Sequence, residues 1–211
     1  VPVSSQLKIY SAIQKQIGIR LQANCLNTLS FLLRHKVKKY YQNLAHYNQW
    51  INKRIYSVAA KLNQDALSQN HGAYFGSIIG TLNHILVGDI LWFKRFATQP
   101  ANYQSLEYFR SVKKPASLDE ILHDELSELS EVREHTDAVI VQFTSEITDE
   151  MIASTLKYKN SKGQEFNKNL GDLLLHVFNH QTHHRGQVST LLYQAGIDIG
   201  VTDMVAGITE K

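Results

Sequence analysis

The stretch HVFNHQTHHRGQ, residues 176–187, holds four of the ten histidines in this chain of 211 residues. In a helix, successive residues turn by about 100°, so positions four apart stand nearly above one another. His176, His180 and His184 would then form one stripe, with His183 to one side. Two imidazoles one turn apart can bind a single metal ion, as in zinc-binding His-x-x-x-His helices. Neutral imidazole suits zinc, nickel, copper or iron better than calcium or magnesium.

This spacing alone is a weak signal, because four histidines within nine positions produce such pairs by chance. The alternative is that His176 and His180 are core residues with satisfied hydrogen bonds, while His183 and His184 face solvent. A further candidate ligand elsewhere in the chain would favour the metal.

His84 lies within the apolar stretch GTLNHILVGDILWF, residues 80–93. Gly80 and Gly88 stand one turn before and one turn after it on the same face, and a glycine inside a helix costs about 1 kcal/mol relative to alanine. The pair predicts room around the imidazole, a gap for a fourth ligand and close approach of another helix. His84 is therefore a candidate third ligand, and three histidines with an open position are typical of a catalytic metal site.

Four helical patterns must position these residues, over about 37–62, 75–97, 117–147 and 169–195. The third begins at SLDE, where Ser117 and Glu120 predict a capping box. Asn169 stands at the N-cap of the fourth, and Gly196 suits the left-handed residue that closes a helix.

The connections complete the predicted architecture. Residues 155–159 and 164–166 flank the turn NSKG and predict a short hairpin. The connection over 98–116 is long and holds two prolines, which indicates a crossover rather than a tight turn. The sequence therefore predicts an all-α fold, a four-helix bundle with one long crossover connection and a small β-hairpin before the last helix.

Composition limits the setting of the protein. The single cysteine, Cys25, cannot form a disulfide within the chain, which favours a reducing, cytoplasmic compartment, and no apolar run is long enough to predict a membrane span. Residues 1–64 carry ten lysines and arginines and no acid, whereas 65–211 carry twelve against nineteen acids, a net of −7. We interpret 1–36 as a basic, ancillary extension to a domain over 37–211. A transit peptide and a nucleic-acid arm are alternatives, and the scattered bases argue against the arm.

Five separated stretches agree in order with one known family: LAHYNQWINKRIY (44–56), FGSIIGTLNHILVGDILWFKRF (75–96), the hairpin near Tyr158, LLLHVFNHQTHHRGQVSTLLYQAG (173–196) and GVTDM (200–204). Over roughly 40–204 the chain resembles the DinB/YfiT-like proteins, a family of metal-dependent four-helix bundles. The resemblance implies one ligand from the second helix and a pair from the last. These fall on His84, His180 and His184, and leave His176 and His183 outside the ligand set.

Other residues match family motif positions without an assigned chemistry: Trp50, Asp89, Trp92, Arg185, Gly186 and Gln187. Asp89 is about 140° around the helix from His84, so we expect it to point elsewhere and to pair with Arg95 or Arg185. We expect Trp92 to be a core residue rather than a substrate contact.

The resemblance implies a metalloenzyme with zinc or nickel and a low-molecular-weight thiol, acting on a small molecule as a transferase, isomerase or hydrolase. Such a metal lowers the pKa of a bound thiol or water. The chain shows no acid–base carboxylate pair, and Cys25 lies in the extension, so a thiol would come from a cofactor. Catalytic residues stay unassigned. The alternative is a non-catalytic metal-binding stress-response protein. A homodimer is expected, whereas a nucleic-acid or membrane partner is not.

Overall fold

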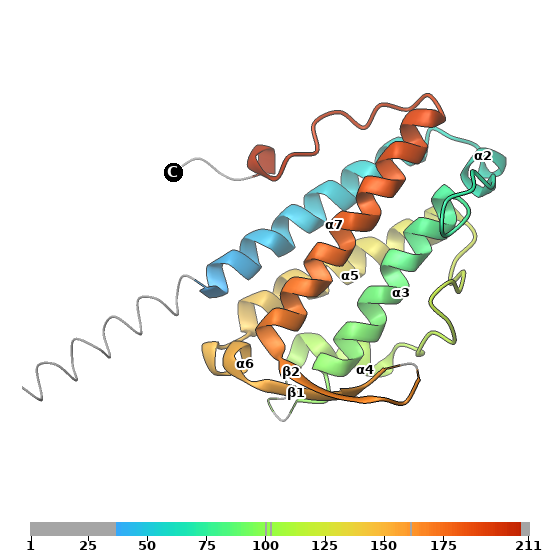
Figure 1. The fold of residues 1–211 in the computed structure, drawn as a ribbon. Coiled ribbons are helices and arrows are strands. Elements are labelled where there is room, and N and C mark those ends of the chain that lie inside the picture. The colour runs from blue at the N-terminus through green and yellow to red at the C-terminus, as the bar shows by residue number, and fades with distance from the viewer. Residues whose placement is uncertain (1–36, 100, 102, 161, 208–211) are drawn as a thin grey trace, which may run out of the picture.

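The computed structural model describes residues 37–99, 101, 103–160 and 162–207, so the prediction for 1–36 lies outside the described residues. Four long helices form a bundle: the N-terminal helix, followed from residue 37 to 59, then α3 (Ile78–Phe96), α5 (Leu126–Glu146) and α7 (Leu170–Gln194). In Figure 1, α7 (orange-red) runs beside α3 (green) along much of its length. The predicted four-helix fold is confirmed.

Four short elements close the ends of the bundle: α2 (Gln64–Ser68), η1 (Gln104–Leu106), α4 (Glu107–Ser111) and α6 (Asp149–Ala153). A fifth, η2 (Met204–Gly207), lies beside the N-terminal helix. The hairpin is also confirmed, with β1 (Thr155–Lys159) antiparallel to β2 (Glu165–Asn169) in the register Tyr158 to Phe166. β2 extends beyond its predicted end because it leads directly into α7, whose N-cap is Asn169. No described helix is long and apolar enough to cross a membrane.

The core lies between the helices and is rich in aromatic rings near the hairpin end. Phe93 of α3 stacks on Phe109 of α4, with ring centroids 4.8 Å apart, and meets Phe143 of α5 edge to face at 5.7 Å. These three side chains are fully buried. Burial of such rings is a leading source of stability, and here it fixes the crossover against α3.

The third helix begins later than predicted. Residues 117–125 are not helical, and α5 begins at Leu126. Ser117 and Glu120 form no capping box; instead the Glu120 carboxylate accepts a hydrogen bond from the amide of Ala116. The crossover is therefore longer than the predicted segment and includes α4.

Asn83 explains why this segment stays extended. Its side-chain oxygen accepts from the amides of Leu122 (2.8 Å) and His123 (3.0 Å), and its amide donates to the His123 carbonyl (2.8 Å). These bonds occupy backbone groups that a helix would use internally. They hold the crossover across α3, one residue from His84.

Both helices that carry the histidines are capped. The Ser77 hydroxyl accepts from the Gly80 amide at 3.0 Å at the start of α3, and the Asn169 side chain accepts from the Asp172 amide at 3.0 Å at the start of α7. Gly196 closes α7 with φ of 80°, as predicted.

Candidate metal centre

Three imidazoles from two helices converge at one point. His84 Nε2 of α3 lies 3.1 Å from His180 Nε2 and 3.2 Å from His184 Nε2, both of α7. Their candidate ligand atoms all lie within 4.8 Å of one another. Tetrahedral bonds of about 2.0–2.1 Å would separate ligand nitrogens by roughly 3.3–3.4 Å. In the histidine triad (His84, His180 and His184), the two separations from His84 Nε2 are therefore close to those of a coordination sphere.

Hydrogen bonds on the far sides of the rings orient two lone pairs toward that point. His84 Nδ1 donates to the carbonyl of Leu118 at 2.7 Å, and His184 Nδ1 donates to Gln187 Oε1 at 2.8 Å. In neutral rings, Nε2 is then the acceptor nitrogen. Two acceptors 3.2 Å apart cannot hydrogen bond to each other. A cation between them would satisfy both, and such outer partners are usual for metal-binding histidines.

The protein environment favours neutral imidazoles. Burial, with the neighbouring charges of His184 and His84, lowers the pKa of His180 to about 3. Burial also lowers the pKa of His84 and of His184, although their hydrogen bonds to Leu118 and Gln187 oppose the shift. Neutral imidazole is the form that binds metals, so the triad is ready for a metal at physiological pH.

Phe75 forms one wall of the site, which the sequence did not predict. Its ring stacks on His84 with centroids 3.6 Å apart and meets His184 edge to face at 5.5 Å. Phe75 precedes α3, whereas the apolar pattern placed it at the beginning of that helix. A β-carbon at Gly80 would lie 2.2 Å from the Phe75 carbonyl oxygen, so the loop that carries Phe75 can pack this closely only against a glycine.

Gly88 allows α7 to pack closely against α3. A β-carbon there would lie 2.7 Å from Cε1 of His180. The predicted close approach at this glycine is thus present. The imidazole of His180 packs against Gly88, and the Phe75 loop packs against Gly80.

His176 and His183 lie outside the triad, as expected. The His176 ring is 6.1 Å from that of His180 and meets Trp92 edge to face at 5.2 Å. His183 is exposed, and its Nε2 lies 3.4 Å from the Gln187 amide nitrogen. That contact fixes the Gln187 amide with its oxygen toward His184.

Space for a small molecule lies beside the triad. A cavity of about 570 Å³, here called the α3–α7 cavity, is lined by residues of α3, α7, the crossover and the hairpin, among them His84, Trp92, Arg95, Leu118 and His180. Trp92 packs against the hydrophobic core, as predicted, but it is only partly buried and also lines this cavity. The open approach to the triad is therefore along α3 toward Trp92.

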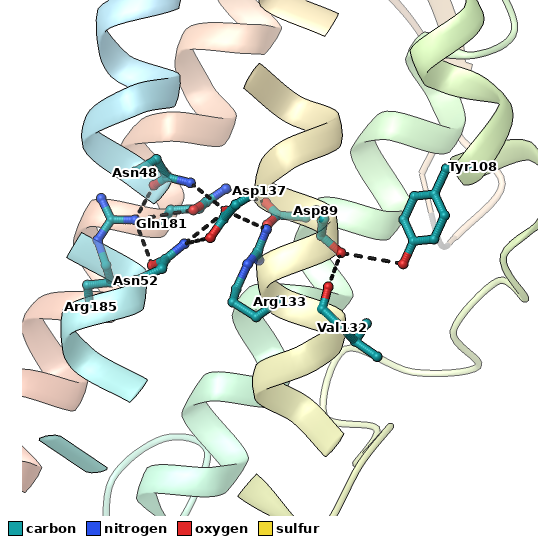
Figure 2. Close-up of polar contacts among 10 residues, drawn as sticks. Asn48, Asn52, Asp89, Tyr108, Val132, Arg133, Asp137, Gln181 and Arg185 are labelled. Carbon is teal, nitrogen blue, oxygen red and sulfur yellow. Dashed lines mark hydrogen bonds and ion pairs between the residues drawn. The ribbon is translucent and has the colours of Figure 1, made fainter. Parts of the chain in front are cut away.

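A buried polar network beside the triad joins all four long helices (Figure 2). Asp89 of α3 is fully buried, pairs with Arg133 of α5 at 2.5 Å and accepts from Gln181 of α7 at 2.7 Å. The expected partners, Arg95 and Arg185, were wrong, because the crossing of α5 brings Arg133 closer. The network is completed by Asn48, Asn52, Asp137 and Arg185.

The network fixes the register of α7 against α3. Asp89 follows Gly88, and Gln181 and Arg185 follow the two ligand candidates of α7 by one residue each. Two carboxylates and two guanidiniums balance in charge, although burial raises the pKa of Asp137 to about 6 and lowers that of Arg185 to about 10. Removing one partner would leave an uncompensated buried charge, which is strongly destabilising.

Comparison with known proteins gives a consistent result. A family model described as the DinB family matches residues 34–210. Protein DinB of Bacillus subtilis (strain 168) is 27% identical over 162 residues, which cover 76% of this chain and 88% of that relative. Among solved structures, a DinB-like protein from Bacillus cereus is 19% identical with a TM-score of 0.49, covering 74% of this chain and 90% of that one.

Proposed function

This chain belongs to the DinB family, and on that premise we propose that it is a metal-dependent enzyme. The histidine triad holds a divalent transition metal, zinc or nickel, with an exchangeable position open to a low-molecular-weight thiol. The reaction is transfer of the thiol to a small electrophile, or isomerisation assisted by it. The observation that carries the proposal is the convergence of three Nε2 atoms beside the α3–α7 cavity.

The charge of the site supports a thiolate reagent. Three neutral imidazoles leave the full charge of a divalent ion uncompensated, so an anion is favoured beside it. The metal, when bound, would lower the pKa of the thiol and hold the sulfur as an anion. The hydrogen bonds from His84 to Leu118 and from His184 to Gln187 keep the rings oriented while the reagent exchanges.

The cavity lining supports an external thiol rather than a protein nucleophile. Among the described residues around the cavity there is no cysteine and no carboxylate. A thiolate nucleophile would therefore arrive with the reagent, and its proton would leave to solvent. In a transfer, sulfur forms the new bond to carbon while the leaving group of the electrophile departs with its electron pair.

The test begins with metal content. Protein purified without an affinity histidine tag should contain close to one zinc or nickel ion per chain. It should then join small thiols to a chloronitrobenzene faster than the uncatalysed reaction, and chelation should abolish the excess rate. The His180→Ala variant should lack this rate and His183→Ala should retain it. A rate that is indifferent to both the metal and His180 would contradict the proposal.

As part of the same proposal, the substrate is a small molecule and the protein is a cytoplasmic homodimer. Light scattering on the eluted protein tests the dimer. A protein that acts only as a metal-binding stress-response module would hold the ion but accept no exogenous ligand. Titrating small thiols into the metal-loaded protein therefore separates the two functions.

A further inference from the structure

The lining of the α3–α7 cavity is strongly cationic. It includes Lys94, Arg95, Lys114 and Lys159, and the described part of the lining holds no aspartate or glutamate. Burial, and secondarily the charge of Lys114, lowers the pKa of Lys94. Residues 65–211 have a net charge of −7, so this concentration of positive charge opposes the general charge of the domain.

Two of the four cations already have partners. The Lys94 ammonium donates to the carbonyls of Phe109 (2.8 Å) and Val112, which ties the crossover to α3. Lys159 pairs with Glu165 at 3.3 Å across the hairpin. Lys94 and Lys159 therefore stabilise the wall of the cavity and add positive potential to it, but their ammonium groups already have partners.

Arg95 has a different environment. Its guanidinium lies over the rings of Trp92 (4.5 Å) and Tyr158 (5.1 Å). Its one hydrogen bond within the described part of the chain, to the Lys159 carbonyl, is long at 3.5 Å. No described carboxylate lies within ion-pair distance of it. Two aromatic rings thus hold a planar group whose donors are largely unused. A guanidinium in this state suits a carboxylate, which it can bind with two parallel hydrogen bonds.

We propose that the α3–α7 cavity binds a carboxylate on the reagent, with Arg95 as its main contact and Lys114 supporting it. This rests on the proposed function, because the sulfur of the same reagent is taken to face the histidine triad. The protein is thereby selective for thiols that carry a negative charge at a distance from sulfur.

The geometry sets that distance. Arg95 follows His84 by eleven residues, or roughly 16 Å along the helix. The Arg95 side chain leans toward the N-terminus, over Trp92, which shortens the gap to on the order of 10 Å. An extended chain advances about 3.3–3.6 Å per three bonds, so roughly eight or nine bonds separate the sulfur from the carboxylate. A short mercapto acid cannot reach both sites.

Matched thiols test this in cobalt-loaded protein, where binding is read from the sulfur-to-cobalt absorption band. 8-Mercaptooctanoate should bind at least about tenfold more tightly than 8-mercaptooctanol, a difference of about 1.4 kcal/mol. 3-Mercaptopropionate should show no such advantage over 3-mercaptopropanol. Arg95→Gln should abolish the preference, whereas Lys61→Gln, an exposed charge change on another part of the surface, should preserve it.

A second measurement needs no metal. Trp50→Phe leaves Trp92 as the single tryptophan, and octanoate but not octanol should change its fluorescence saturably unless Arg95 is replaced by glutamine. Equal affinity for acid and alcohol, or a preference that survives Arg95→Gln, would overturn the inference while leaving the proposed function intact. If no thiol reaches cobalt, the proposed function fails, and the Trp92 titration still decides whether Arg95 binds a carboxylate.

Discussion

His84 and His184 each commit one ring nitrogen to a fixed acceptor, and this choice decides what the other nitrogen can do. With Nδ1 donating to Leu118 or Gln187, each Nε2 presents a lone pair to the centre of the triad. Burial keeps protons off these nitrogens. The individual residues are thus arranged for a cation, and the hydrogen bonds that achieve this lie outside the triad.

Replacing any triad histidine with alanine should weaken metal binding by more than about 100-fold, since loss of an outer partner alone typically costs about 10–100-fold. His183→Ala is the matched control, because His183 neighbours His184 but points away. Metal content after dialysis and competition with a chelating dye measure metal binding in the triad variants and in His183→Ala. Loss of metal in His183→Ala with retention in His184→Ala would show that the wrong histidine was chosen.

The metal-free protein should lose stability as the pH falls below about 6.5, the pKa of an unperturbed histidine. In the folded chain the pKa of His180 is lowered to about 3. Between these values the unfolded chain binds the proton more readily, so the free energy of unfolding rises with pH across this window. His180→Asn should flatten this slope in urea titrations from pH 4 to pH 7. An unchanged slope would mean that His180 is not perturbed.

At the scale of elements, the site depends on how closely α3 and α7 approach. Gly88 lies against the His180 ring, and the buried network that includes Asp89, Gln181 and Arg185 fixes the rotation of the two helices. An error of one residue in this register would move every ligand. The helices therefore do more than carry the histidines, because their contact sets the distances between them.

Gly88→Ala should weaken metal binding by at least about tenfold, because the new methyl group displaces His180. Gly186→Ala is the control: it lies in the same helix pair, no atom lies within 4 Å of its added β-carbon, and it should raise stability by roughly 0.5–1 kcal/mol. Thermal melting and metal titration compare the two. Normal metal affinity in Gly88→Ala would show that the helices can separate without cost to the site.

The sequence predicted the four helices because they follow from periodicity. The spacing of the histidines alone left several ligand choices open, and the resemblance to the DinB/YfiT-like family was what implied His84, His180 and His184. The sequence did not predict the late beginning of α5, since the Asn83 bonds to Leu122 and His123 link segments far apart in the chain. The partner of Asp89 was missed for the same reason. Phe75 was indistinguishable from a helix residue by apolar pattern alone. The apolar pattern of one segment does not predict its contacts with distant segments.

At the scale of the molecule, the described chain forms one bundle whose C-terminal segment returns along the N-terminal helix. Tyr47 Oη donates to the Thr202 carbonyl and Arg54 Nε to the Ile199 carbonyl, each at 2.6 Å. These two hydrogen bonds therefore join the C-terminal segment to the N-terminal helix. Its boundary at residue 37 remains a prediction.

A chain that begins at Val37 should keep its helical circular dichroism, a cooperative melt and its metal, because the predicted core and the triad lie beyond that point. The full-length protein is the reference, and a transition midpoint within about 2 °C of it corresponds to a difference near 1 kcal/mol or less. Loss of cooperativity on truncation would show that residues 1–36 contribute to the bundle.

The central claim is a metal on the histidine triad with one exchangeable position. Titrating 2-mercaptoethanol into cobalt-loaded protein tests it most directly, because a sulfur ligand adds an intense near-ultraviolet band. We expect this band to appear, to saturate and to be accompanied by proton release, and we expect it to be absent in His184→Ala. A cobalt spectrum that is indifferent to this thiol and to azide would show a closed site and contradict the account.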